Sequence, residues 1–256
     1  MRLAHTEPGI AVLTLARGDG TGPNLMDERF CTQLQAACDT LAQDPALHAL
    51  LLRAEGPSFC VGADLGALQA RRDTLAQHLG DLIDLAHAAA LALRRIPVPV
   101  IACVHAVAAG GGFSLAMLCD QVIAAKPARF VAAYPALGTS PDCGLTHTLA
   151  ARLGPRRAQS LLLDTRALDL PRALGLGIVD EVAAPGQLEP TALTAARRLA
   201  AVPRQALAET KAHFLREDLP MLAERLDAER AAFLRCAQTP AFHERVAAFG
   251  AGRRAG

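Results

Sequence analysis

The sequence predicts an α/β fold in which strands alternate with helices, followed by a helical C-terminal region. Apolar runs of strand length alternate with amphipathic stretches of helical length through most of the chain, and this alternation is typical of α/β crossovers rather than of a sandwich. After about Pro185 the strand pattern stops and only helical patterns remain. The 256 residues can bury a full core. We therefore expect a core over 1–185 and a helical region over 186–256.

The first elements follow from apolar periodicity. Residues 9–16, GIAVLTLA, predict a strand, and 24–42 predict an amphipathic helix that ends at Asp44-Pro45. The apolar run 47–53 predicts the next strand. A loop, AEGPSFCVGADLGAL, follows it, with Asp64 placed to cap a short helix.

The middle of the chain repeats this order. A long helical pattern over 73–95 leads to a β-branched, proline-flanked run, 98–104, which predicts a buried strand. After three glycines we expect a helix from Ser114 onward. Residues 120–125 predict a further strand, and 129–133 are expected to be extended.

The remaining segments are mostly helical. We expect a turn-rich loop over 137–144, and a last strand over 178–182. The predicted helices cover 145–153, 156–163, 189–201, 204–216, 221–235 and 241–249. Because an appended helical region generally covers another surface, we expect 186–256 to form a subunit interface.

Composition argues against several classes of protein. The formal net charge is +1, the arginine pairs are scattered, and the chain has one tyrosine and no tryptophan. Neither a nucleic-acid interface nor a membrane-surface protein is indicated. The N-terminus lacks the pattern of a signal peptide, and no stretch of eighteen apolar residues predicts a membrane span.

The cysteines and histidines do not predict a metal site. Seven cysteines are scattered without a CxxC pair, and none of the eight histidines forms HxxxH or HExxH. This pattern is better explained by cysteines that act as small apolar residues in a reducing cytoplasm than by disulfide bonds or a zinc site. We expect no metal and a cytoplasmic location.

The stretch Ile101–Asp120 predicts an anion or oxyanion site. Gly110, Gly111 and Gly112 have no Cβ, so a ligand can approach the main chain closely, and the N–H groups at the start of the following helix favour negative charge. A tight turn or close helix packing would explain the same glycines. A phosphate loop is not supported, because no GKS or GKT follows. The sequence GFSLA is one residue short of a hydrolase elbow.

Two segments together resemble the crotonase superfamily, the enoyl-CoA hydratase/isomerase family. One is SFCVGADL, residues 58–65, and the other is AAGGGFSLAMLCD, followed at family spacing by ARF and by LGTSPDCGLTHTLAARLG. The resemblance covers nearly the whole chain. It implies a crotonase (ClpP/crotonase-like) spiral of ββα turns, trimers or dimers of trimers, and binding of an acyl-CoA. Coenzyme A would then enter as part of the substrate, with no separate cofactor.

The resemblance also assigns candidate site residues. Family members hold the thioester carbonyl between two backbone N–H groups, and the matching residues are Ala63 and Gly111. Such donors acidify the carbon beside the thioester by stabilising negative charge on its oxygen. The resemblance implies that the acyl-CoA lies against Phe59, Val61, Ala63, Asp64, Leu65, Gly110 and Gly111.

The departures from the family decide the expected reaction. A hydratase of this family has two glutamates where this chain has Ser114 and Tyr134. Hydration needs one group for water and another for the α-carbon proton, so ordinary hydratase activity is not expected. Asp142 matches the aspartate of a subset of double-bond isomerases with an LGxxPDxG loop. One base suffices to move a C=C bond through a dienolate.

Several alternatives stay open. Pro-Asp-x-Gly is also a common turn sequence, and Asp142 would act as a nucleophile if the chain resembles the family's aryl-CoA dehalogenases, although aromatic residues are few. Tyr134 either assists catalysis or is a wall, and Ser114 fits a helix-start hydroxyl. A non-catalytic acyl-CoA binder is the remaining reading. Weaker candidates are His147 and His105 near the site, and Lys211 and Phe214 for contact with CoA.

Overall fold

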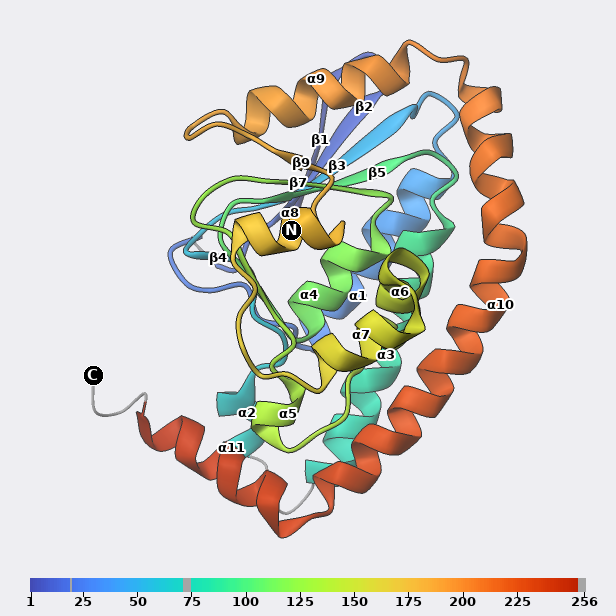
Figure 1. Cartoon of the computed structure of the whole chain (residues 1–256). Helices are drawn as coiled ribbons and strands as arrows, with labels where there is room; N and C mark the ends of the chain where they lie inside the picture. Colours follow the sequence, from blue (N-terminus) through green and yellow to red (C-terminus); the bar gives the residue numbers. More distant parts are fainter. Residues whose placement is uncertain (19, 71–74, 253–256) are drawn as a thin grey trace.

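The computed structural model describes residues 1–18, 20–70 and 75–252 (Figure 1). Within these residues, one sheet has six strands in the order β1-β2-β3-β5-β7-β9 and another has three in the order β4-β6-β8. β1 (Arg2–Glu7) pairs antiparallel with β2 (Ile10–Leu15), and the other described strand pairs are parallel. No described helix has both the length and the apolar character needed to cross a membrane.

Three successive ββα units build the two sheets. Each unit gives one strand to the large sheet, one to the small sheet, and then continues into helix. The units are β3 (Ala49–Ala54), β4 (Ser58–Cys60), α2 (Leu65–Ala70) and α3 (Leu75–Arg95); β5 (Val100–Val104), β6 (Val107–Ala109) and α4 (Gly111–Leu118); and β7 (Gln121–Ala124), β8 (Arg129–Val131) and α5 (Tyr134–Leu137). This arrangement confirms the predicted spiral of ββα turns.

The central strands of the large sheet, β2, β3, β5 and β7, are mostly buried on both faces, which explains their continuous apolar runs. Leu50 and Leu52 face the main core, together with α1 (Glu28–Ala42) and α3. Ala49 and Leu51 face the opposite side, where α9 (Leu188–Ala200) covers the sheet. The strand period of two residues therefore divides one apolar run between two cores.

The remaining elements are five helices and the last strand of the large sheet. They are α6 (Leu145–Leu153), α7 (Pro155–Leu162), α8 (Leu170–Leu176), β9 (Glu181–Val182), α10 (Arg204–Ala237) and α11 (Pro240–Gly252). The helical C-terminal region is confirmed for the described residues after Pro185. The sequence did not predict β1, β4, β6, α5 or α8; β4 and β6 have three residues each and α5 has four, which is too short to show a period.

Several predicted boundaries were wrong. Helix α1 begins at Glu28 rather than at Asn24, and β9 covers only Glu181–Val182 of the predicted 178–182. Residues 73 and 74 of the predicted helix 73–95 lie outside the described residues.

The predicted helices 204–216 and 221–235 are one helix, α10, which continues through Pro220. An interior proline costs roughly 3 kcal/mol, and burial of Leu215, Leu222 and Leu226 on one side of α10 offsets this cost. Helix α4 begins at Gly111 rather than at Ser114, so the glycines belong to its first turn.

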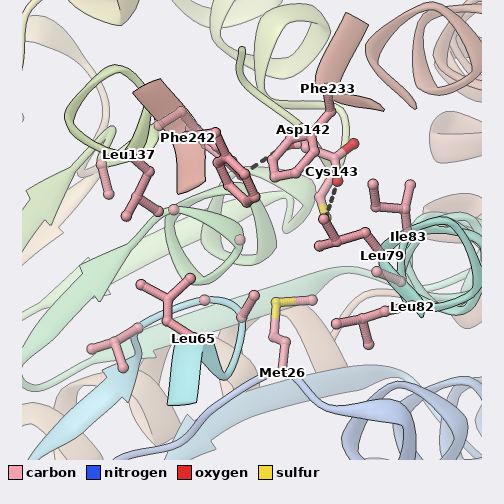
Figure 2. A pocket seen from close by; sticks show the side chains of 18 residues that line it. Met26, Leu65, Leu79, Leu82, Ile83, Leu137, Asp142, Cys143, Phe233 and Phe242 are labelled. Atoms are coloured by element: carbon pink, nitrogen blue, oxygen red, sulfur yellow. Dashed lines mark hydrogen bonds between the residues drawn. The ribbon is translucent and has the colours of Figure 1, made fainter. Parts of the chain in front are cut away.

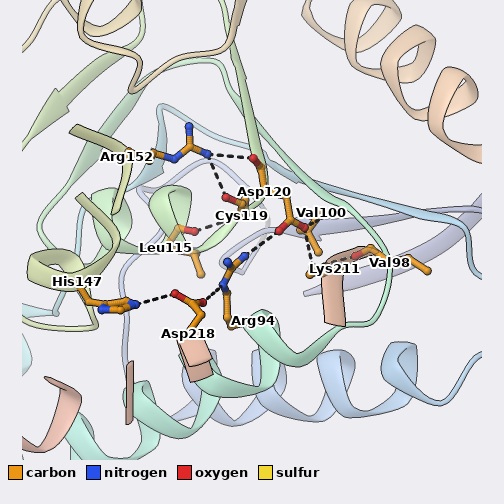
Figure 3. Close-up of polar contacts among 10 residues, drawn as sticks. All are labelled: Arg94, Val98, Val100, Leu115, Cys119, Asp120, His147, Arg152, Lys211 and Asp218. Atoms are coloured by element: carbon orange, nitrogen blue, oxygen red, sulfur yellow. Dashed lines mark hydrogen bonds and ion pairs between the residues drawn. The ribbon is translucent and has the colours of Figure 1, made fainter. Parts of the chain in front are cut away.

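A network of charged residues anchors the first half of α10 to the core (Figure 3). Lys211 Nζ donates to the Val98 carbonyl at 3.0 Å and to Asp120 Oδ2 at 2.6 Å. Arg94 donates to Asp120 and Asp218, each at 2.8 Å. Burial lowers the pKa of Lys211, and the Asp120 carboxylate opposes this shift. Its ammonium is committed to this network, which argues against the predicted contact of Lys211 with CoA.

Candidate active site

One pocket brings together the two segments that carry the family resemblance (Figure 2). It lies between α3, the loop after β4, the start of α4, the Asp142 loop and the C-terminal helices α10 and α11. The residues that line it are Met26, Val61, Gly62, Ala63, Leu65, Leu79, Leu82, Ile83, Ala86, Gly110, Gly111, Ala133, Tyr134, Leu137, Asp142, Cys143, Phe233 and Phe242. Apart from the polar groups of the Asp142 loop, the lining is apolar, as expected for an acyl group.

Two glycine-rich turns meet at one wall of this pocket. Gly62 has φ +80°, and a Cβ there would stand 3.2 Å from the Gly111 nitrogen. Gly110 is the N-cap of α4 with φ 53° and ψ −125°, a conformation open to glycine alone. Gly111 is the first residue of α4, where the N–H has no acceptor within the helix. The backbone at Ala63 and Gly111 therefore lines the same wall.

Asp142 is the only carboxylate among the described residues that line the pocket. Its side chain is buried, and its Oδ1 lies 2.6 Å from Nε2 of His87 on α3. With Nε2 protonated, His87 donates to the carboxylate and holds one of its oxygens. The thiol of Cys143 donates to Oδ2 at 3.7 Å, and burial raises the pKa of this thiol well above its usual value. Asp142 thus has a fixed orientation in an apolar pocket.

Ser114 and Tyr134, at the positions of the family's glutamates, hold the backbone of Asp142. The Ser114 hydroxyl donates to the Asp142 carbonyl at 2.9 Å, and the Tyr134 hydroxyl donates to the same oxygen at 3.0 Å. The two hydroxyl groups lie 2.9 Å apart. Burial raises the pKa of Tyr134 well above its usual value, so its phenol is neutral. The pair has the geometry of a support for Asp142.

Asp142 and its two side-chain partners, His87 and Cys143, form the one described group with possible metal-ligand spacing. The ligand atoms of His87, Asp142 and Cys143 lie within 4.8 Å of one another. Nitrogen and oxygen ligands of a tetrahedral zinc ion, about 2.0–2.1 Å from the metal, lie roughly 3.3 Å apart. The distance of 2.6 Å between His87 and Asp142 is instead that of a hydrogen bond. The absence of a metal remains a prediction.

The structure separates some predicted residues from the pocket. Phe59 is fully buried in the core, and neither Phe59 nor Asp64 is part of the lining. Asp64 instead accepts from Arg17 at 3.0 Å and from the N–H groups of Gly66 and Ala67, so it holds the loop that presents Ala63. Burial opposes the effect of these donors, which together lower the pKa of Asp64.

The weaker histidine candidates do not reach Asp142. His147 bonds to Asp218 at 2.7 Å, and His105 bonds to the Gly56 carbonyl at 2.9 Å. The histidine that contacts Asp142 is His87, which the sequence did not single out. Its signal was a histidine within the mostly apolar helical run LIDLAHAAALAL, whose other polar residue is Asp84; such a pattern is also typical of a satisfied core histidine.

The C-terminal helices supply a further part that sequence reasoning missed. Phe233 of α10 and Phe242 of α11 line the pocket, with ring centroids 6.4 Å apart in an edge-to-face arrangement. Leu75 and Leu79 of α3 belong to the same buried cluster. The chain therefore closes its own pocket with residues from the region beyond Pro185. Aromatic side chains are present at the pocket despite their scarcity in the chain.

Two sheets built from ββα units, with a glycine-lined wall and one buried carboxylate at an apolar pocket, define a protein of the crotonase superfamily. The enoyl-CoA hydratase/isomerase family model matches residues 5–255. The 1,2-epoxyphenylacetyl-CoA isomerase of Escherichia coli (strain K12) is 33% identical over 252 residues, which cover 98% of this chain and 95% of that protein. A probable enoyl-CoA hydratase of Rhizobium meliloti (strain 1021) is 32% identical over 253 residues, covering 99% and 96%.

The fold is shared with solved structures as well. The crystal structure of an enoyl-CoA hydratase from Bacillus halodurans matches with a TM-score of 0.88 at 22% identity, covering 96% of this chain and 99% of that one. This chain belongs to the enoyl-CoA hydratase/isomerase family, and it is an enzyme of that family acting on acyl-CoA. The named relatives include both isomerases and hydratases, so similarity to them does not determine which reaction this enzyme catalyses.

Proposed function

We propose that this protein is an enoyl-CoA isomerase that moves a C=C bond between the 3,4 and 2,3 positions of an acyl-CoA. The observation that carries the proposal is Asp142, the single carboxylate among the described pocket residues, which lies beside His87 and shares the pocket with Ala63 and Gly111. Proton transfer from one carbon to another needs one base that can take and return a proton. No second carboxylate is required.

The proposed reaction uses backbone and side chain in turn. The N–H groups of Ala63 and Gly111 bind the thioester oxygen and stabilise the negative charge that develops there. Asp142 removes a proton from the carbon next to the thioester, which yields a dienolate, and returns it to the carbon two positions further along. The double bond is then conjugated with the thioester. His87 keeps the carboxylate oriented during both transfers.

The arrangement of Ser114 and Tyr134 argues against hydration. A hydratase must position a water molecule and also move a proton to the α-carbon, which needs two acid/base groups. Here the two hydroxyl groups donate to the Asp142 carbonyl. Neither is a carboxylate, and the neutral phenol of Tyr134 is a weak base.

In a second candidate reaction the Asp142 carboxylate is a nucleophile: it attacks a ring carbon of an aryl-CoA, displaces a halide from that carbon and forms an aryl ester. Water then attacks the ester carbonyl of Asp142 and releases the hydroxylated aryl-CoA. The pairing of His87 with Asp142 favours this candidate, because a histidine can activate the water molecule that hydrolyses the ester formed on Asp142. Phe233 and Phe242 can also contact an aromatic ring. A single turnover in ¹⁸O-labelled water would leave label in the Asp142 carboxylate if this reaction occurs, and no label if Asp142 only transfers protons.

The deciding experiment follows conversion of 3-enoyl-CoA esters of several chain lengths to conjugated 2-enoyl-CoA. We expect Asp142→Asn to lower kcat by about 10²- to 10⁴-fold, the contribution of a general base. Asp39→Asn, on the exposed side of α1, is the matched control and should retain full activity. If the wild type binds acyl-CoA but neither isomerises it nor exchanges its α-proton with solvent, a non-catalytic binder replaces the isomerase.

We further propose a homotrimer, or a dimer of trimers, in a reducing cytoplasm. An apolar groove between α6, α7 and α10 supports assembly, and its rim carries Leu163 and Met221 with 75% and 51% of their surface exposed. All seven cysteines are free, which supports a reducing compartment. Sedimentation equilibrium of the purified protein tests the assembly, and a monomer mass at micromolar concentration would refute it.

A further inference from the structure

Glu229 connects the C-terminal helix to the loop that carries Asp142. It lies on α10, and its side chain is buried with 5% of the residue surface exposed. Its Oε2 accepts from the Gly144 N–H at 2.7 Å, and its Oε1 accepts from the Thr146 N–H at 3.0 Å and from the Thr146 hydroxyl at 2.5 Å. A buried carboxylate is costly unless hydrogen-bonded, and these three donors satisfy it.

These bonds replace the local cap of helix α6. Gly144 is the N-cap of α6 and has no side chain to accept from the first turn. Glu229, 85 residues later in the chain, fills this place, where the helix dipole also favours a negative charge. The carboxylate therefore holds α6 from outside the helix, at the residue that follows Cys143.

The backbone between Asp142 and α6 has a conformation that needs stabilising contacts. Cys143 has φ 58° and Gly144 has φ 77°, so two successive residues adopt the left-handed conformation. This conformation is unfavourable for a residue with a Cβ and persists where surrounding contacts enforce it. A Cβ on Gly144 would stand 2.6 Å from Leu222 Cδ1, so α10 packs directly against the turn.

Asp142 is consequently held on both sides. Ser114 and Tyr134 bind its carbonyl, and Glu229 binds the turn two residues further on. Phe233, one helical turn after Glu229, lines the acyl pocket. The same part of α10 thus contacts the proposed acyl site and the turn that aims the base.

We propose that Glu229 is a positioning residue for the isomerase reaction, which orients Asp142 toward His87 and the substrate by fixing the turn at Cys143 and Gly144. This inference rests on the proposed function for its kinetic readout. Its geometric content, that Glu229 determines the contact between His87 and Asp142, is independent of which reaction the pocket performs.

The test compares Glu229→Ala, Glu229→Gln and Thr146→Val with Glu224→Ala, an exposed acidic residue on the same helix. We expect Glu229→Ala to lower kcat about tenfold to a hundredfold, as small displacements of a catalytic group do, with binding of a saturated acyl-CoA changed less than about threefold. Glutamine keeps one oxygen acceptor and should restore part of the rate. Thr146→Val should act in the same direction but less, and Glu224→Ala should match the wild type.

A proton NMR measurement gives the second readout. The atoms His87 Nε2 and Asp142 Oδ1 are 2.6 Å apart, and the proton in this hydrogen bond should give a downfield imidazole resonance. The resonance is assigned by its loss in His87→Ala. We expect this resonance to shift or broaden in Glu229→Ala and Thr146→Val, and to stay unchanged in Glu224→Ala. All variants are measured well below their unfolding temperatures.

An unchanged resonance in folded Glu229→Ala and Thr146→Val would overturn the proposal, as would unchanged kcat with only KM raised. If Glu229→Ala does not fold, the kcat and the imidazole resonance of Thr146→Val and Glu229→Gln decide whether Glu229 positions Asp142. If the wild type shows no isomerase activity, the proposed function fails, and the resonance still decides whether Glu229 positions Asp142.

Discussion

Tyr134 donates its hydroxyl to the Asp142 carbonyl, an oxygen that already accepts from Ser114. The sequence left open whether Tyr134 assists catalysis or forms a wall, because a tyrosine in place of a glutamate fits both. In the structure it touches Ser114 and the backbone of the proposed base. A support acts through the position of Asp142, whereas a proton donor acts on the substrate itself.

Tyr134→Phe distinguishes these roles. If the phenol only supports Asp142, its loss removes one hydrogen bond of about 1 kcal/mol and lowers kcat by less than about tenfold, because Ser114 still binds the same carbonyl. Loss of a proton donor would instead cost about 10²-fold or more. Steady-state kinetics with a 3-enoyl-CoA decides, and a drop in the larger range would identify Tyr134 as a catalytic acid.

At the scale of one element, helix α4 depends on glycine for close approach to β4. An added Cβ on Gly112 would stand 2.0 Å from the Cys60 carbonyl oxygen, a backbone atom that cannot rotate away. On Gly111 it would stand 2.5 Å from Met26 Sδ, which belongs to a flexible side chain. Gly112 thus allows the tight packing that was one interpretation of the glycine run, whereas Gly111 lines the pocket and its role as an oxyanion donor stays a prediction.

We expect Gly112→Ala to lower the free energy of unfolding by at least about 3 kcal/mol, because the strand or the helix must move. The matched control is Gly175→Ala in α8, where an added Cβ would meet nothing within 4 Å. An alanine there should raise stability by about 0.5–1 kcal/mol through helix propensity. Urea unfolding followed by circular dichroism measures both, and equal effects would contradict the packing argument.

At the scale of the whole molecule, α10 joins parts that are distant in sequence (Figure 1). Lys211 binds Asp120, which follows α4, Asp218 binds Arg94 at the end of α3, and Glu229 caps α6. The helix therefore connects the segments just before the central strands β5 and β7 with the pocket. Its polar anchors are partly or fully buried, so loss of one leaves a charge or a hydrogen-bond donor of its partner unsatisfied.

Asp218→Asn tests one anchor through its pH dependence. Burial by itself would raise the pKa of Asp218, but the hydrogen bond from His147 and the charge of Arg94 lower it below 3.8. A carboxyl group whose pKa is lowered by folding contributes stability above its unfolded pKa, and this contribution disappears as the pH falls through the folded pKa. We expect Asp218→Asn to cost about 2 kcal/mol at pH 7.

The difference between wild type and Asp218→Asn should shrink as the pH falls below about 3.8, the unfolded value. Urea titrations from pH 3 to pH 7 measure it, with Asp227→Asn on the exposed side of α10 as control. A difference that is independent of pH would show that the charge of Asp218 is not what anchors the helix.

Local sequence was sufficient for the fold class and most core strands, and it singled out the glycines and Asp142 that the structure places at one pocket. Strand and helix periods, glycine runs and the segments SFCVGADL and AAGGGFSLAMLCD are properties of neighbouring residues, so they can be read without coordinates. Local rules failed at Pro220, where a helix breaker lies inside a continuous helix. There the burial of an apolar side of α10 outweighs the local preference.

Contacts across the chain were decided only by the tertiary structure. His87 and Asp142 are 55 residues apart, and Glu229 is 85 residues from Gly144. Neither pair leaves a local pattern, because a histidine in an apolar helix and a glutamate in a long helix are each compatible with many roles. The sequence by itself determined the fold class and named the backbone and the carboxylate for which we propose a chemical role. Packing of α3 and α10 around the Asp142 loop decided how that carboxylate is held, because burial forces each polar group to find a partner.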